Sequence, residues 1–135
     1  MSAQNDPGAF AALCERARSV LAPRRLSEHA EAGGVAAALL GASGNVYLGV
    51  CVDTACSMGF CAEHAAAAAM LTAGESRVLR AVALAWDGRV LPPCGRCREF
   101  LSQLDPHNAE AEVLVAPGLV CTLRELLPQD WKAKR

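Results

Sequence analysis

The 135-residue sequence predicts a single α/β domain spanning residues 1–135, a three-layer αβα sandwich built around a mixed five-stranded sheet. Three observations lead to this prediction. The length is that of one ordinary domain, and 53% of the residues are hydrophobic, as in a globular protein. Segments with strand character alternate with helical segments after an initial hairpin. We see no internal repeat, low-complexity segment or domain boundary.

The first predicted helix follows Asp6 and Pro7, residue types that suit an N-cap and the first helical position. Its apolar residues recur at helical spacing, at Phe10, Leu13, Cys14, Ala17 and Leu21. Pro23 ends this pattern. The apolar stripe is expected to pack this helix on the sheet.

Strands are predicted where apolar runs lie between turn signals, at residues 35–40, 46–52, 78–86, 113–115 and 118–121. The first two flank a turn at residues 41–45 and form the hairpin. The third carries few charges, which is typical of a strand buried on both faces, and residues 89–91 are a short continuation of it. Residues 24–31 are polar and are assigned to a connection.

Two further long helices are predicted at residues 61–73 and 95–104. The first is rich in alanine and is followed by Gly74, a suitable C-cap. The second lies between Pro92-Pro93 and Asp105-Pro106. A short helix is also expected around residues 123–127.

Charge and cysteine content narrow the class of protein. The net charge is −1 with acidic and basic residues intermixed, which argues against a nucleic-acid or membrane surface. No apolar segment has the length of a membrane span, and the first six residues lack the features of a signal peptide, so we expect a cytoplasmic protein. In a reducing compartment, seven cysteines indicate metal binding or catalysis rather than a disulfide framework.

Cys94 and Cys97 lie three residues apart at the start of a predicted helix. Their sulfurs therefore face the same way and can hold one metal ion. The positive potential at a helix N-terminus also favours thiolate over thiol. A Cys-x-x-Cys pair alone fits a redox pair or half of a structural zinc site equally well.

Cys61 opens the other predicted helix, and Glu63 follows two residues later. Three cysteines leave the fourth position of a tetrahedral zinc open, which is typical of a catalytic site. A water in that position has its pKa lowered to about 7. Glu63, beside the metal without ligating it, is placed to shuttle protons.

Together these segments match the signature of zinc deaminases, in which Cys-x-Glu is followed by Pro-Cys-x-x-Cys. From residue 35 to residue 127 the chain resembles the cytidine deaminase family. The resemblance is carried by Val35-Ala36-Ala37-Ala38-Leu39-Leu40, Ala55-Cys56, Cys61-Ala62-Glu63, Pro93-Cys94-Gly95-Arg96-Cys97-Arg98 and Glu125-Leu126-Leu127-Pro128. It is strongest to the small tetrameric branch that acts on free nucleosides and includes cytidine and blasticidin S deaminases.

This resemblance implies zinc ligated by Cys61, Cys94 and Cys97, with Glu63 as the catalytic acid and base. It implies that the backbone N–H groups of Ala62 and Cys94 contact the ring carbonyl and the zinc-bound hydroxyl. The implied partner is a small-molecule nucleoside or aminopyrimidine, and the implied assembly is a homotetramer with the alanine-rich helices near its centre.

The substrate end departs from the family. Cytidine deaminases usually carry Asn-x-Glu-Asn-Ala before the zinc helix, and its Asn and Glu hold the ribose hydroxyls. Here Cys51 and Asp53 occupy those positions. A ring-stacking Phe that usually precedes residue 35 is absent from Ala32-Gly33-Gly34.

We therefore predict a hydrolase that deaminates a cytidine-like nucleoside or related aminopyrimidine. A blasticidin S deaminase-like or other specialised enzyme is the alternative within this class. The alternative from another class is a non-catalytic binding protein with zinc closed by a fourth thiol. The candidates for that thiol are Cys14, Cys51, Cys56 and Cys121.

Three more residues have sequence-level interpretations. His64 is expected to pack or to serve an interface, because it points away from Glu63 on the helix. Arg98 is expected to offset the charge of the zinc thiolates. Trp131 either caps a pocket or packs on the surface.

Overall fold

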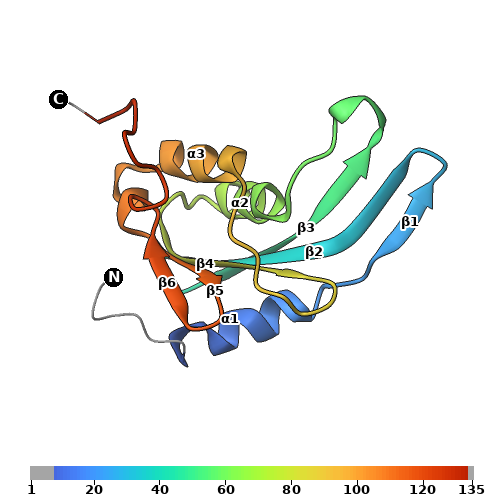
Figure 1. Ribbon diagram of the computed structural model, residues 1–135, viewed down its shortest axis with the longest axis horizontal. Coiled ribbons are helices and arrows are strands. Elements are labelled where there is room, and N and C mark those ends of the chain that lie inside the picture. The colour runs from blue at the N-terminus through green and yellow to red at the C-terminus, as the bar shows by residue number, and fades with distance from the viewer. Residues whose placement is uncertain (1–7, 134–135) are drawn as a thin grey trace.

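The computed structural model describes residues 8–133, in which a mixed sheet lies between α1 on one face and α2 and α3 on the other (Figure 1). The helices are α1 (Gly8–Arg18), α2 (Ala62–Thr72) and α3 (Gly95–Leu104). The predicted three-layer α/β architecture is confirmed. The cap predicted at Asp6 and Pro7 lies outside the described residues.

The sheet contains the strands β1 (Arg24–Ser27), β2 (Ala30–Gly41), β3 (Val46–Thr54), β4 (Val78–Ala85), β5 (Glu112–Ala116) and β6 (Leu119–Thr122). The five expected strands lie in the order β3-β2-β4-β5-β6, and β1 pairs with the first residues of β2. β4 and β5 pair in parallel, while the other neighbours are antiparallel, so the sheet is mixed as predicted.

The prediction of five strands is wrong by one, because β1 forms in the segment assigned to a polar connection. All four residues of β1 are exposed, so no apolar alternation marks it in the sequence. It is held by its register with the extended start of β2, where Arg24 pairs with Ala32 and Arg25 with Glu31. These strands form an arm that projects beyond the helices (Figure 1).

The prediction of a short helix around residues 123–127 is also wrong. This segment forms successive turns, in which the Leu126 N–H donates to the Leu123 carbonyl at 3.0 Å and the Leu127 N–H to the Arg124 carbonyl at 3.1 Å. Leu123 is buried under these turns. Leu126 and Leu127 also pack against the same core cluster, so the turns are held by tertiary contacts.

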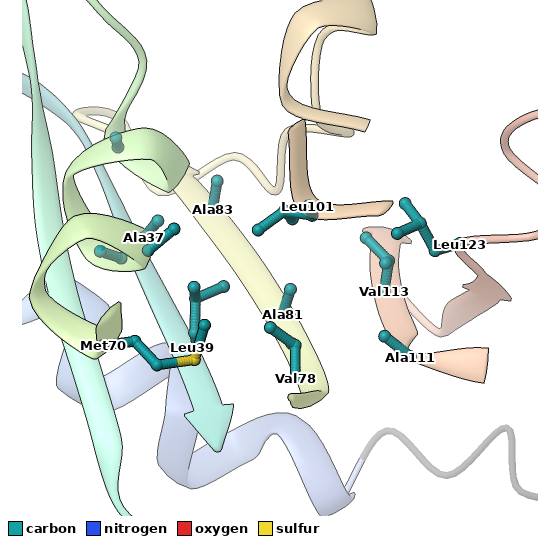
Figure 2. Packing of buried hydrophobic residues seen from close by; sticks show 13 residues of the cluster. Ala37, Leu39, Met70, Val78, Ala81, Ala83, Leu101, Ala111, Val113 and Leu123 are labelled. Carbon is teal, nitrogen blue, oxygen red and sulfur yellow. The ribbon is translucent and has the colours of Figure 1, made fainter. Parts of the chain in front are cut away.

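Two apolar clusters hold the layers together. On one face of the sheet, Phe10, Leu13 and Ala17 of α1 are buried against β2 and β4, as the apolar stripe predicted. On the other face, Leu39 of β2 and Met70 of α2 pack in a cluster that is otherwise rich in small residues (Figure 2). Among residues 8–133, none of the helices combines the length and apolar character that crossing a bilayer requires.

The two helices that carry the cysteine segments are positioned by specific close contacts. A Cβ at Gly49 of β3 would lie 2.2 Å from the Ala66 nitrogen and 2.6 Å from the Ala62 oxygen, so α2 rests directly on the strand backbone. At the end of α3, the buried Asn108 accepts from the Val78 N–H at 2.7 Å and donates to the Leu101 carbonyl at 2.9 Å. This hydrogen-bonded side chain ties α3 to the start of β4.

Candidate active site and metal centre

The N-termini of α2 and α3 bring three cysteines together. Cys61 is the N-cap of α2 and Cys94 is the N-cap of α3, both with extended backbone, and Cys97 lies in the first turn of α3. The Sγ atoms of Cys61 and Cys94 are 3.4 Å apart, and those of Cys94 and Cys97 are 3.5 Å apart. All three sulfurs lie within 4.8 Å of one another.

This arrangement fits a zinc ion. Tetrahedral zinc with Zn–S bonds of about 2.3 Å needs ligand sulfurs roughly 3.8 Å apart, and the three thiols are free rather than paired in disulfides. Within residues 8–133, the metal-ligating cluster contains none of the other four cysteines. Three thiolates would leave the fourth position of a tetrahedral zinc ion open, as in catalytic zinc sites.

Glu63 lies in the first turn of α2 and is 6% exposed. Burial raises the pKa of its carboxyl group, while hydrogen bonds from its own backbone N–H and from the Cys97 thiol act in the opposite direction. A carboxyl group with a raised pKa, next to a cluster that could hold a metal and out of bulk water, is suited to accept and return a proton.

The three thiols differ in their readiness to ionise. Burial raises the pKa of Cys61 and raises the pKa of Cys97 strongly, the latter with a further contribution from the Glu63 carboxylate. Burial acts in the same direction on Cys94, but hydrogen bonds from the Cys97 backbone and the Cys61 thiol lower its pKa overall.

A pocket of about 410 Å³ opens above the cluster, a volume within the range of small-molecule sites. It is lined by Val35, Cys51, Asp53, Gly59, Phe60, Cys61, Ala62, Glu63, Ala83, Leu91, Pro92, Cys94 and Arg96. Every residue predicted to bind substrate is among them, and Cys97 lies buried beside Cys94.

The two predicted ribose-end residues hold different positions on β3. The Cys51 sulfur accepts from the Val35 backbone N–H at 3.3 Å, so it is anchored to the neighbouring strand β2. Asp53 is exposed and lies at the outer part of the pocket. Ala62 is fully buried in the first turn of α2, where backbone N–H groups have no helical partner.

Phe60 is a pocket residue that the sequence reasoning missed. Its backbone is pinned to β3, because its N–H donates to the Val52 carbonyl at 2.9 Å and its carbonyl accepts from the Val52 N–H at 3.0 Å. The preceding Gly59 is required by this pairing, since a Cβ there would lie 2.1 Å from the Val52 oxygen. The signal available in the sequence was an aromatic residue directly before Cys61.

Other predicted residues have defined contacts. The Arg98 Nε donates to the Pro93 carbonyl at 2.7 Å, and its Nη1 donates to the Leu126 carbonyl at 3.3 Å. These bonds join the start of α3 to the C-terminal turns instead of reaching a sulfur. Trp131 is 74% exposed and its Nε1 donates to the Glu99 carboxylate at 3.2 Å, outside the pocket lining.

No family model matches the chain. A cytidine deaminase from Halalkalibacterium halodurans is 33% identical over 104 residues, which span 74% of this chain and 78% of that protein. The crystal structure of cytidine deaminase from Mycobacterium tuberculosis has a TM-score of 0.76 at 29% identity, covering 92% of this chain and 98% of its own. The Mycobacterium leprae cytidine deaminase has a TM-score of 0.75 at 27% identity, covering 89% and 98%. On its 33% identity to the Halalkalibacterium halodurans enzyme, and with the cysteine cluster beside Glu63, the chain belongs to the cytidine deaminase family.

Proposed function

We propose that the protein is a zinc-dependent hydrolase that deaminates a cytidine-like nucleoside or related aminopyrimidine. Water would add to the ring carbon that bears the amino group, and the bond from that carbon to the amino nitrogen would break, leaving a ring carbonyl and free ammonia. The observation that carries this proposal is the cluster of three sulfurs within 4.8 Å of one another, next to the buried Glu63 at the inner end of a pocket. Membership in the cytidine deaminase family supports it.

Zinc held by Cys61, Cys94 and Cys97 would supply a Lewis acid that lowers the pKa of a bound water to about 7. Glu63 would take one proton from that water and deliver it to the ring nitrogen, and would then carry the second proton of the same water to the amino group, which leaves as ammonia. The backbone N–H groups of Ala62 and Cys94, at two helix N-termini, would hold the ring carbonyl and the attacking oxygen. The surrounding protein shields Glu63 from bulk water, since this residue is 6% exposed.

The replacement Glu63→Gln tests the proton-transfer role. We expect zinc content per chain to stay the same and ammonia release to fall by about 10²- to 10⁴-fold, because the amide cannot move the proton. Glu15→Gln on the exposed face of α1 is the matched control and should keep full activity. Full activity of Glu63→Gln, or wild-type protein without metal, would exclude the proposal.

A specialised enzyme of blasticidin S deaminase type is a second candidate. The observation that favours it is the outer pocket, where Cys51, already held by a backbone hydrogen bond, and Asp53 stand at the positions expected to bind ribose hydroxyls. Turnover of cytidine, deoxycytidine, cytosine and blasticidin S, compared at equal enzyme concentration, separates the two. Robust turnover of cytidine would remove this alternative.

We also propose a homotetramer in the cytoplasm. The outer face of α2 supports the assembly, because Ala68 and Ala69 are exposed and Leu71 is 41% exposed. Seven free thiols support a reducing compartment. Light scattering after size exclusion should give four times the mass of the 14.1 kDa chain, and a monomer would exclude the assembly.

A further inference from the structure

His64 connects the two helices that carry the cysteines. It follows Glu63 in the first turn of α2, and its ring stacks on Phe100 of α3 with centroids 4.3 Å apart and planes inclined by 13°. This stacking confirms the packing expected for His64. The stacking also fixes the orientation of the His64 ring, because the two rings lie on α2 and α3, which are both docked on the same sheet.

That orientation directs Nδ1 of His64 at the sulfur of Cys97, 3.2 Å away. Cys97 is fully buried, so water cannot solvate its sulfur. A zinc ion on three thiolates carries one excess negative charge, since its own charge is two. A buried, negatively charged sulfur is stabilised by a hydrogen-bond donor within reach.

The arginines near the cluster do not supply this donor. Arg96 is exposed, and the guanidinium group of Arg98 donates to the Pro93 and Leu126 carbonyls. The expectation that Arg98 offsets the charge of the thiolates stays a prediction, and its hydrogen bonds go to carbonyl oxygens. The contact with Cys97 comes instead from His64.

We propose that His64 is a positioning residue that donates an Nδ1–H hydrogen bond to the Cys97 sulfur and stabilises the metal-bound thiolate. This inference rests on the proposed function in taking the three cysteines as metal ligands. A metal-bound thiolate has no proton, so it can only accept, and the proton of the neutral ring must lie on Nδ1.

Metal affinity of variants tests the role. His64→Phe keeps a flat ring over Phe100 but has no donor, while His64→Asn keeps a donor N–H close to the position of Nδ1. We expect His64→Phe to weaken zinc binding by about 10- to 100-fold in competition with a chelator. His64→Asn should recover most of that affinity, and His107→Phe, at an exposed histidine away from the cluster, should leave it unchanged.

The cobalt-substituted protein gives a readout independent of turnover. The sulfur-to-cobalt charge-transfer band of wild type should move in His64→Phe and return toward its wild-type position in His64→Asn. Unchanged affinity and an unchanged band in a folded His64→Phe would overturn the inference while leaving the proposed function intact. Wild-type protein that binds neither zinc nor cobalt would overturn both.

A measurement on the wild-type protein covers the case in which the variant does not fold. Nitrogen NMR of the zinc-loaded protein, at a pH where the ring is neutral, should show the proton of His64 on Nδ1. A proton on Nε2 instead would overturn the inference without any substitution.

Discussion

The two ends of the pocket are built from different kinds of structure. At the metal end, the cysteines are held by the first turns of α2 and α3, where Glu63 is 6% and Cys97 0% exposed, while Cys61 is half-buried and Cys94 is exposed to the pocket. At the outer end, Asp53 and Phe60 come from the end of β3 and the loop after it, and Phe60 is 40% exposed. The metal end is therefore anchored in the core through Cys97 and Glu63, whereas Asp53 and Phe60 at the outer end belong to the surface.

This difference separates the type of reaction from the choice of substrate. Helices packed on the sheet hold the metal ligands and Glu63, so few changes there are compatible with the fold. The outer end includes a loop in which Cys56 and Ser57 have left-handed backbone, with φ of 62° and 56°. The departures from the family at Cys51, Asp53 and residues 32–34 lie on the neighbouring strands β3 and β2, at this same outer end.

The largest expected effect comes from removing a metal ligand. Cys97→Ala should abolish stoichiometric zinc binding and reduce ammonia release by at least about 10³-fold, because the metal contributes several kcal/mol to the reaction. Cys121→Ala, at a cysteine on β6 away from the cluster, should keep both. Stoichiometric zinc in Cys97→Ala, measured by metal analysis, would show that the metal end does not depend on the buried sulfur.

A smaller effect is expected where α2 rests on β3. Gly49→Ala places a methyl group 2.2 Å from the Ala66 nitrogen, so it should destabilise the fold by about 1–3 kcal/mol, measured by urea unfolding. Gly34→Ala is the matched control, because no atom lies within 4 Å of its Cβ, and its effect should stay within about 0.5 kcal/mol. Equal stability of the two variants would contradict the account of a metal end held by close backbone packing.

The smallest expected effect is at the outer end. Phe60→Leu should raise KM by about tenfold with kcat nearly unchanged, since stacking of a base on an aromatic ring contributes roughly 1–3 kcal/mol. Met58→Leu, in the same loop but outside the pocket lining, should have wild-type kinetics. A lower kcat with unchanged KM in Phe60→Leu would mean that this residue acts on the metal end.

Local signals account for the elements that the sequence predicted best. The helix predicted at residues 95–104 has the bounds of α3, because Pro92-Pro93 and Asp105-Pro106 mark both ends. The apolar stripe of α1 was predicted from another local signal, the helical spacing of Phe10, Leu13 and Ala17. β1 was missed because its exposed residues carry no pattern, and only pairing with β2 makes it a strand.

The cysteine cluster is the clearest case of what the sequence determined by itself. Cys94 and Cys97 at three-residue spacing on a helix start must face the same way, and Cys61 with Glu63 repeats that local geometry on a second helix start. These residues and their chemistry were therefore predictable before any tertiary structure.

Tertiary structure alone decided how these local pieces meet. Residues 33 positions apart place two sulfurs 3.4 Å from each other because α2 and α3 dock on one sheet. The same docking brings His64 to Cys97, and the pairing of Phe60 with Val52 brings an aromatic ring to the pocket. Side-chain spacing along one helix follows from the chain's own periodicity, whereas contacts between elements depend on how the whole core packs.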